Sequence, residues 1–428
     1  MQISSLEEGS GPIVAKLKAV YSRLVWAIVL KNRGFGLPFQ LISRTSNPRS
    51  RKRRAASRKA VRMRAHPLVR PLALLAMMVT WPLLVWRGVR GLSDEERAGR
   101  SRLYVAWLSL TANFSPSNLV DCGCLHRPVH SIDDVIEPLE TIQLMVRLRS
   151  AMAGGETKWM EVINNKAKFA HFCAENDLPH PALYGSWDGT GERLRAVQAF
   201  GRPAPNGDIV LKPACSARGR GIELWSKQQG AELWSKDEGE ALTFEQLEDR
   251  CRNAALRDGG AMLQERAICS PNLHLANPTQ SPTVRVWMGT WPTGEHEAFG
   301  QYMNYPAHDG FVSHYVNGGS LLGVEESTGV LFAPKPAGYR YDSEAAQNIG
   351  RQLPHWEEGL VMLERAQSRV PAYSIILGWD IVFTVTGPVL LEANFAFPIT
   401  PAYMINGTSA DLTRLEDFYA AWIERLSL

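Results

Sequence analysis

Residues 378–394 constrain the fold of this chain more than any other segment does. They consist of two apolar runs separated by Thr386-Gly387, a dipeptide that favours a tight turn. Two antiparallel strands are therefore expected. Asp380 lies on the first strand, while Glu392 and Asn394 lie two residues apart on the second and share one face. The sequence predicts that two carboxylates and one amide meet on this hairpin.

Two carboxylates and an amide form a set of hard oxygen donors. Mg²⁺ prefers such a set, because it is usually held by one or two carboxylates together with phosphate oxygens of a substrate. Asp380, Glu392 and Asn394 are therefore the candidate metal ligands. The alternative is a hairpin with one solvated polar face, which leaves unexplained why the apolar runs 389–391 and 395–399 flank these polar residues.

A lysine closes another expected strand, 208–213, and a loop with two glycines follows it. The loop, residues 214–221, has the sequence Ala-Cys-Ser-Ala-Arg-Gly-Arg-Gly. Glycine lets backbone N–H groups approach phosphate oxygens, and Lys212 could neutralise them. A simple hairpin would have the same composition, and the spacing matches neither the P-loop nor the dinucleotide fingerprint.

From Ser93 onward, expected helices and strands alternate, with many antiparallel connections. Helices are expected at 133–152, 165–177, 243–257 and 354–369, and strands at 208–213, 221–225, 261–265, 283–288, 329–332, 375–383 and 389–392. This pattern is typical of an α+β fold.

The N-terminal part differs from the rest in charge. Residues 1–70 contain 16 Lys and Arg against two Glu, and no acidic residue lies between Glu8 and Asp94. Residues 44–64 are too charged and too poor in large apolar side chains to fold alone. We expect a basic leader over residues 1–66. A transit peptide and a nucleic-acid arm are alternatives, but neither accounts for the apolar stretch that follows.

Two segments near the N-terminus are suited to a membrane surface. Residues 11–31 combine apolar side chains at helical spacing with interspersed Lys and Arg. Residues 71–86 carry no charge, but they are shorter than the roughly 20 residues that span a bilayer, and Pro82 interrupts them. We expect an interfacial or re-entrant anchor, and so peripheral membrane contact through residues 11–92. A true span and a helix buried in the folded body are the alternatives.

Six cysteines are scattered through the chain, which fits reduced thiols in the cytoplasm better than a disulfide framework. Cys122 and Cys124, with His126 and His130, superficially resemble a metal site. Zinc sites usually place two or more residues between paired cysteines and need a second half-site. An ordinary loop with buried thiols is expected instead.

The order of these motifs resembles that of the ATP-grasp superfamily. The Lys212 strand and its glycine loop come first, then Met262-Leu-Gln-Glu-Arg266, then Asp380 and Glu392-Ala-Asn394. Residues 264–266, Thr283-Val-Arg-Val286, 353–358 and 378–394 are similar to the sugar-transfer-associated ATP-grasp proteins, which are related to α-L-glutamate ligases. The resemblance covers about 165 to 405. It implies an ATP-grasp fold, in which two α+β subdomains clasp ATP, with a helical, basic N-terminal extension.

The resemblance also implies domain limits and a role for each candidate residue. The expected parts are a leader (1–66), an apolar membrane-proximal segment (67–92), a helical linker region (93–160) and the ATP-grasp domain (161–428). The expected nucleotide-binding residues are Lys166, Lys212, Ser216, Gly219, Gly221, Gln264 and Glu265. Arg285 and Lys212 are the expected catalytic residues, and Asp380, Glu392 and Asn394 would hold Mg²⁺ or Mn²⁺. A solvated Lys166 and a surface Arg285 on an edge strand remain alternatives.

The implied activity is that of a carboxylate–amine ligase. ATP would phosphorylate a carboxylate to an acyl phosphate, which an amine then attacks, and the family's association with sugar transfer implies a role in the modification of an envelope polysaccharide or glycan. A phosphotransferase and a catalytically degenerate nucleotide-binding scaffold are the alternatives. Ser216 and Ala217 stand where glycine is frequent in the superfamily, and Phe395-Ala-Phe-Pro398 stands where many relatives have arginine. We expect a cytoplasmic protein, or one peripheral to the cytoplasmic membrane face, with no nucleic-acid partner.

Overall fold

The computed structural model describes residues 47–63, 70–153, 158–194, 207–216, 219–236, 239–308, 310–313, 315–335, 341–395, 397–407 and 412–428. The segment 11–31, expected to form an amphipathic helix, lies outside these residues. The chain divides into two compact units, which we call unit 1 (residues 1–147 with 427–428) and unit 2 (residues 148–426). Unit 2 begins before the domain start predicted at residue 161, so the limits of the functional domain stay a prediction.

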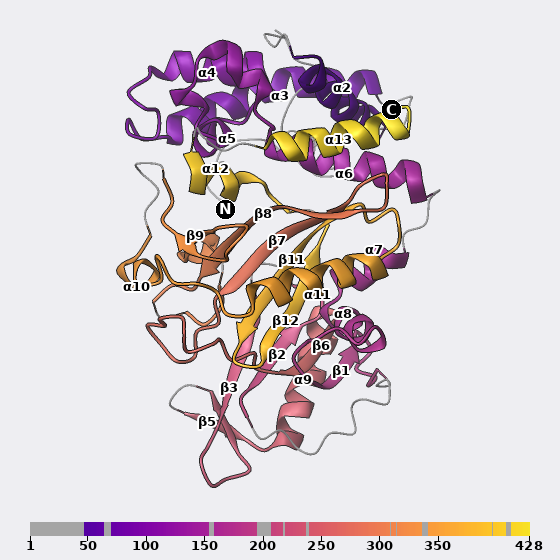
Figure 1. The fold of residues 1–428 in the computed structure, drawn as a ribbon, viewed down its shortest axis with the longest axis vertical. Coiled ribbons are helices and arrows are strands. Elements are labelled where there is room, and N and C mark those ends of the chain that lie inside the picture. The colour runs from indigo at the N-terminus through magenta and orange to yellow at the C-terminus, as the bar shows by residue number, and fades with distance from the viewer. Residues whose placement is uncertain are drawn as a thin grey trace, which may run out of the picture. The chain divides into compact units, whose positions relative to one another are not determined.

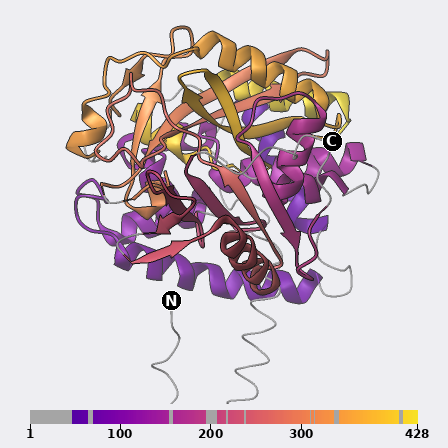
Figure 2. The same ribbon diagram turned by 90° about the horizontal axis from the view of Figure 1, so that it is seen from below.

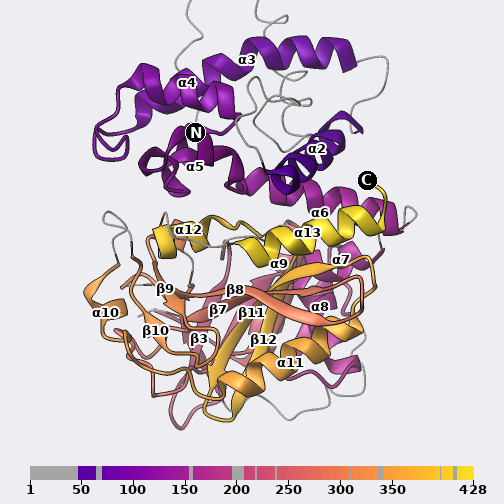
Figure 3. The same cartoon turned by 45° about the horizontal axis from the view of Figure 1, so that its top comes forward.

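Unit 1 is helical in the residues described (Figures 1 and 3). Its elements are α2 (Pro48–Met63), α3 (Arg70–Gly91), α4 (Arg102–Ala112), α5 (Pro116–Asp121), the 3₁₀ turns η2 (Cys124–His126) and η3 (Val129–Asp134), and most of α6 (Pro138–Ala153). Along the described part of α3, Trp81, Val85 and Val89 are buried whereas Leu83 is exposed. Across the described ranges, no helix has both the length and the apolar character that crossing a membrane requires.

The arginine-rich run of α2 folds against an acid that is distant in sequence. Arg53 and Arg54 are buried, and Arg53 Nε donates to Glu140 Oε1 on α6 at 2.9 Å. Arg147 Nη1 donates to the carbonyl oxygen of Ala56 at 2.6 Å. This run was not expected to fold alone. Within unit 1 it forms a helix, because contacts with α6 stabilise it.

The helix expected from Asp133 begins at Pro138 instead. Proline has no N–H to donate, and it disfavours helical geometry at the residue before it, so it suits a first turn and not a helix interior. Residues 129–134 form η3. Cys122 and Cys124 are buried where α5 ends and η2 begins, and burial raises the pKa of both thiols. These two cysteines therefore belong to a loop with buried thiols, as expected.

Unit 2 contains two six-stranded antiparallel sheets, which Figure 2 distinguishes by colour. The first has the order β1-β6-β2-β3-β4-β5, formed by β1 (Leu183–Asp188), β2 (Ile209–Pro213), β3 (Glu223–Lys227), β4 (Trp234–Lys236), β5 (Glu240–Leu242) and β6 (Gly260–Glu265). Helix α9 (Phe244–Asp258) buries Leu247 and Cys251 in the core of this sheet together with Trp187 and Trp225. A capping box at Thr243 starts α9, and left-handed Gly259 ends it.

The second sheet has the order β10-β9-β8-β7-β11-β12. Its strands are β7 (Thr283–Thr290), β8 (His296–Tyr305), β9 (Ser320–Val324), β10 (Leu331–Phe332), β11 (Ile376–Thr384) and β12 (Gly387–Asn394). Helix α11 (Trp356–Arg369) covers one face (Figure 1) and contributes Trp356, Met362 and Leu363 to the core. The remaining elements are α7 (Lys158–Asn164), α8 (Lys166–Glu175), η5 (Tyr315–Asn317), α10 (Ser343–Ala346), α12 (Thr400–Asn406) and α13 (Thr413–Arg425).

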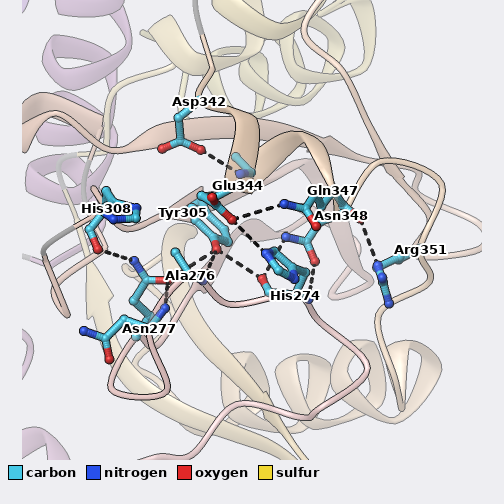
Figure 4. A network of polar contacts seen from close by, with 12 residues as sticks. His274, Ala276, Asn277, Tyr305, His308, Asp342, Glu344, Gln347, Asn348 and Arg351 are labelled. Atoms are coloured by element: carbon cyan, nitrogen blue, oxygen red, sulfur yellow. Dashed lines mark hydrogen bonds and ion pairs between the residues drawn. The ribbon is translucent and has the colours of Figure 1, made fainter.

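A polar network ties the connection between β6 and β7 to the end of β8 (Figure 4). The hydroxyl of Tyr305 donates to the carbonyl oxygen of His274 and accepts from the N–H of Ala276, both at 3.1 Å. The ring of His274 lies 2.8 Å from Glu344 on α10. These bonds satisfy buried polar groups and hold β8 in place beside β7.

Replacing Glu140 with alanine is expected to lower the free energy of unfolding by about 3 to 5 kcal/mol, because Arg53 would stay buried without its carboxylate. Urea unfolding followed by circular dichroism measures this change. Glu95→Ala, at an exposed position in the same unit, is the matched control and should change stability little. Equal effects from the two variants would contradict the importance of the Arg53–Glu140 pair.

Candidate active site

A row of four side chains crosses the second sheet from β12 to β8. Glu392, Asp380, Arg285 and Tyr302 are successive cross-strand partners on β12, β11, β7 and β8. Directly opposed residues project from the same face of a sheet, so these four side chains form one line. Asn394 lies two residues further along β12, and its Nδ2 donates to Glu392 Oε1 at 3.3 Å. The hairpin expected from the sequence thus brings the three predicted metal ligands together.

Arg285 lies at the centre of this row. Its Nε donates to Asp380 Oδ1, and its Nη2 donates to Asp380 Oδ2 at 2.5 Å, which gives a bidentate ion pair. The two side chains are 12% and 10% exposed. Glu392 Oε1 lies 4.0 Å from Nη2 of the same guanidinium. Because β7 lies between β8 and β11, Arg285 is not a surface residue on an edge strand.

Lys166 connects the row to the loop that follows β2. It is the first residue of α8, where the side chain of Asn165 caps the helix by accepting from the N–H of Lys168. Its Nζ lies 3.1 Å from Glu392 Oε2 and donates to the carbonyl oxygen of Ser216 at 2.6 Å. At 17% exposure, this side chain is not the solvated residue of the alternative interpretation.

Lys212 projects from β2 of the first sheet. Its Nζ donates to Gln264 Oε1 on β6 at 2.9 Å, and Gln264 Nε2 donates to the carbonyl oxygen of Pro181 at 3.2 Å. Burial, with a smaller contribution from Lys166, lowers the pKa of Lys212 to about 8. The ammonium group therefore bonds a neutral amide, and its pKa lies below the ordinary range of a lysine.

The pKa values of the two carboxylates are shifted in opposite directions. Burial raises the pKa of Asp380 above its ordinary value despite the opposing effect of Arg285. Burial also acts to raise the pKa of Glu392, but Lys166 and Arg285 outweigh it and lower that pKa. Glu392 is thus held in its charged form by cations on both sides.

A cavity of about 170 Å³ joins these groups. Eight of the eleven candidate residues line it: Lys166, Lys212, Gly219, Gln264, Glu265, Arg285, Asp380 and Glu392. Ser216, Gly221 and Asn394 do not line it. The carboxylate of Glu265 accepts from the N–H of Ala182 at 3.2 Å. Gly219 has a positive φ of 71°, and a Cβ there would overlap Val312 on the opposite wall, so glycine is required.

Two lining residues, Tyr302 and Asn304, were not predicted because they come from β8, which was not expected. Thr283 of the expected strand β7 also lines the cavity, and its Oγ1 lies 2.6 Å from Ser313 Oγ. Asn304 is 5% exposed, and its Oδ1 accepts no hydrogen bond from the residues described. The alternation of Tyr302, Asn304 and the core residues Met303 and Tyr305 is the signal that could have revealed this strand.

The donor set agrees with a hard divalent cation. Two carboxylates and one amide lie on adjacent strands, and two carboxylates are as many as Mg²⁺ usually takes from a protein when phosphates complete its coordination. No group of three His, Cys, Asp or Glu suited to a metal occurs in the described part of the chain. Asp380, Glu392 and Asn394 thus suit a cation shared with a phosphorylated ligand better than an all-protein site.

A model of the family described as sugar-transfer associated ATP-grasp matches residues 155–418. The chain belongs to this family. The match includes every candidate residue and confirms both the predicted resemblance and the ATP-grasp fold.

Among the solved structures similar to this chain are two ligases and a synthetase. The L-amino acid ligase from Bacillus licheniformis is 12% identical over 64% of this chain and 53% of its own, with a TM-score of 0.33. D-alanyl-alanine synthetase A from Vibrio cholerae is 13% identical over 62% and 66%, with a TM-score of 0.35. The D-alanine–D-alanine ligase from Bacillus anthracis complexed with ATP is 9% identical over 62% and 65%, with a TM-score of 0.32. This chain therefore spans about half the length of the first of these proteins. No curated protein matches it.

Replacing Arg285 with alanine is expected to cost about 3 kcal/mol of folding stability, because the directly opposed Asp380 and Glu392 would lose the guanidinium that pairs with the first and lies near the second. The double variant Arg285→Ala/Asp380→Ala should be less destabilised than the sum of the two single variants. Urea unfolding of all four proteins measures this coupling. Strict additivity would show that the pair does not stabilise the sheet.

Proposed function

We propose that unit 2 is an ATP-dependent ligase that activates a carboxylate as an acyl phosphate and transfers the acyl group to an amine. The observation that carries this proposal is the row Glu392, Asp380 and Arg285 on the second sheet, with Lys166 and Lys212 lining the same cavity. Anionic and cationic groups at close range suit a phosphate chain with its divalent cation. Membership of an ATP-grasp family supports the nucleotide as the source of the phosphoryl group.

The nucleotide would bind along the first sheet. Val210, Ile222 and Leu391 provide apolar lining for the base, and residues 264–267 provide the adjoining backbone. Gln264 orients the ammonium of Lys212 toward the phosphates, together with Lys166. We infer that Ser216, Gly219 and Gly221 belong to a loop that covers the phosphates, and that Glu265 contacts the ribose or adenine.

Asp380, Glu392 and Asn394 would hold Mg²⁺ or Mn²⁺. Such an ion neutralises charge on the phosphate oxygens when it is bound. Arg285 lies between these ligands and Tyr302, where it can stabilise the negative charge of the transferring phosphoryl group and of the acyl phosphate.

The second substrate would lie on the side of Tyr302, Asn304 and Thr283. Burial raises the pKa of Tyr302, so its hydroxyl stays a hydrogen-bond donor at neutral pH. A carboxylate oxygen attacks the γ-phosphorus in line and releases ADP. The amine nitrogen then attacks the carbonyl carbon, loses a proton, and expels inorganic phosphate to leave an amide. The family's association with sugar transfer makes sugar-borne acids and amines the first substrates to test.

Replacing Glu392 with alanine is expected to reduce the formation of ADP and amide by roughly 10²- to 10³-fold, the range seen when one electrostatic group of an active site is removed. Mass spectrometry of products from a panel of amino acids and acidic sugars, with Mg-ATP, measures this. Glu240→Ala, on an exposed residue of β5, is the matched control. A phosphorylated hydroxyl as the sole product would show a phosphotransferase, and no ATP turnover would favour a scaffold.

The affinity for ATP is expected to fall as the pH rises from 7 to 9. Lys212 carries its charge below its pKa of about 8 and loses it above, so the attraction for phosphate weakens through that range. Lys212→Arg, which stays charged, should flatten the profile. Binding of a non-hydrolysable ATP analogue at each pH measures the effect. An unchanged profile in the variant would place the titrating group elsewhere.

A further inference from the structure

Exposed apolar side chains gather on two helices of unit 1 that contact each other, α3 and α4. Leu83 on α3 is 65% exposed and Leu103 on α4 is 72% exposed. We call the full set the outer apolar face: Met78, Val79, Leu83, Leu84, Trp86, Leu103 and Trp107. These are seven of the twelve large hydrophobic side chains that are exposed among the residues described, and the other five are scattered over unit 2. Single exposed residues are ordinary, whereas a cluster marks an interaction surface.

From Trp81 to Val89, one side of α3 is packed into the protein. Trp81, Val85 and Val89 are buried, and Gly88 approaches Pro116 of α5 so closely that a Cβ would lie 3.0 Å from its ring. A helix held in this way cannot leave the unit to cross a bilayer without exposing those core residues. It can, however, rest its outer side on a surface.

Cationic side chains border the outer apolar face. Arg90 follows the apolar run on α3, Arg100 lies two residues before α4, and Arg102 is the first residue of α4; all three are exposed. The guanidinium of Arg100 lies 5.5 Å from the centroid of the Tyr104 ring. The exposed acids at 94–96 lie in the turn beyond the C-terminal end of α3. Over residues 1–147, the chain has 23 Lys and Arg against 10 Asp and Glu.

We propose that the outer apolar face docks on the surface of an anionic phospholipid bilayer. Its apolar side chains would enter the boundary between headgroups and acyl chains, and the neighbouring arginines would contact lipid phosphates. A second copy of this chain would bring two strongly positive units together, which charge repulsion disfavours. A nucleic acid offers phosphates but no apolar phase for seven hydrophobic side chains. An anionic membrane supplies both.

The test is co-sedimentation of the full chain with phosphatidylcholine vesicles that contain or lack phosphatidylglycerol. Binding is expected only with phosphatidylglycerol, and it should weaken at high salt. Leu83→Glu/Leu103→Glu should weaken binding by about tenfold or more, because it removes apolar contacts and adds charges that anionic lipids repel. Val361→Glu on α11, where the native side chain is 66% exposed, is the matched control and should bind like the wild type.

Three results would overturn the proposal. The wild type could fail to bind vesicles with phosphatidylglycerol, or the double variant could bind them as tightly as the wild type. Analytical ultracentrifugation without lipid could also show a wild-type dimer that becomes a monomer in the double variant but not in Val361→Glu, which would assign the face to a second copy of the chain. Circular dichroism establishes that each variant keeps its helices.

Discussion

The bidentate pair between Arg285 and Asp380 is the interaction on which the candidate site depends. Asp380 and Glu392 are directly opposed on neighbouring strands, an arrangement that like charges would destabilise. The guanidinium from the next strand offsets one carboxylate and approaches the other, and Lys166 holds the second from the opposite side. The protein can therefore keep two acids close together on one face of this sheet.

The cations come from both sheets and from a helix, so the site joins the parts of unit 2. Arg285 belongs to the second sheet, Lys212 to the first, and Lys166 to the start of α8. Each is fixed by a different partner: a carboxylate, a neutral amide, and a carboxylate together with a backbone carbonyl. Among the residues described, no acid forms an ion pair with Lys212, and its burial lowers its pKa to about 8.

The sequence was informative where local pattern decides structure. The hairpin at 378–394 could be predicted from its two apolar runs and the turn between them, whereas the bulge between Asp380 and Ile381 that sets Asp380 opposite Glu392 could not. Long-range packing was not accessible in the same way. Arg53 can be buried because it pairs with Glu140, which lies 87 residues further along the chain. No local property of the arginine-rich run indicates that partner. Strand β8 was missed because its polar residues and Gly300 lower its apparent strand character, while pairing with β7 and β9 stabilises it.

The ammonium of Lys166 links the loop after β2 to the strand β12. One group bonds the carbonyl of Ser216 and neutralises Glu392, so any displacement of the loop that draws this ammonium away leaves the acid with less compensation. An arriving polyphosphate would compete for the same ammonium. Under the proposed function, an incoming cation would then balance Glu392 in place of this ammonium.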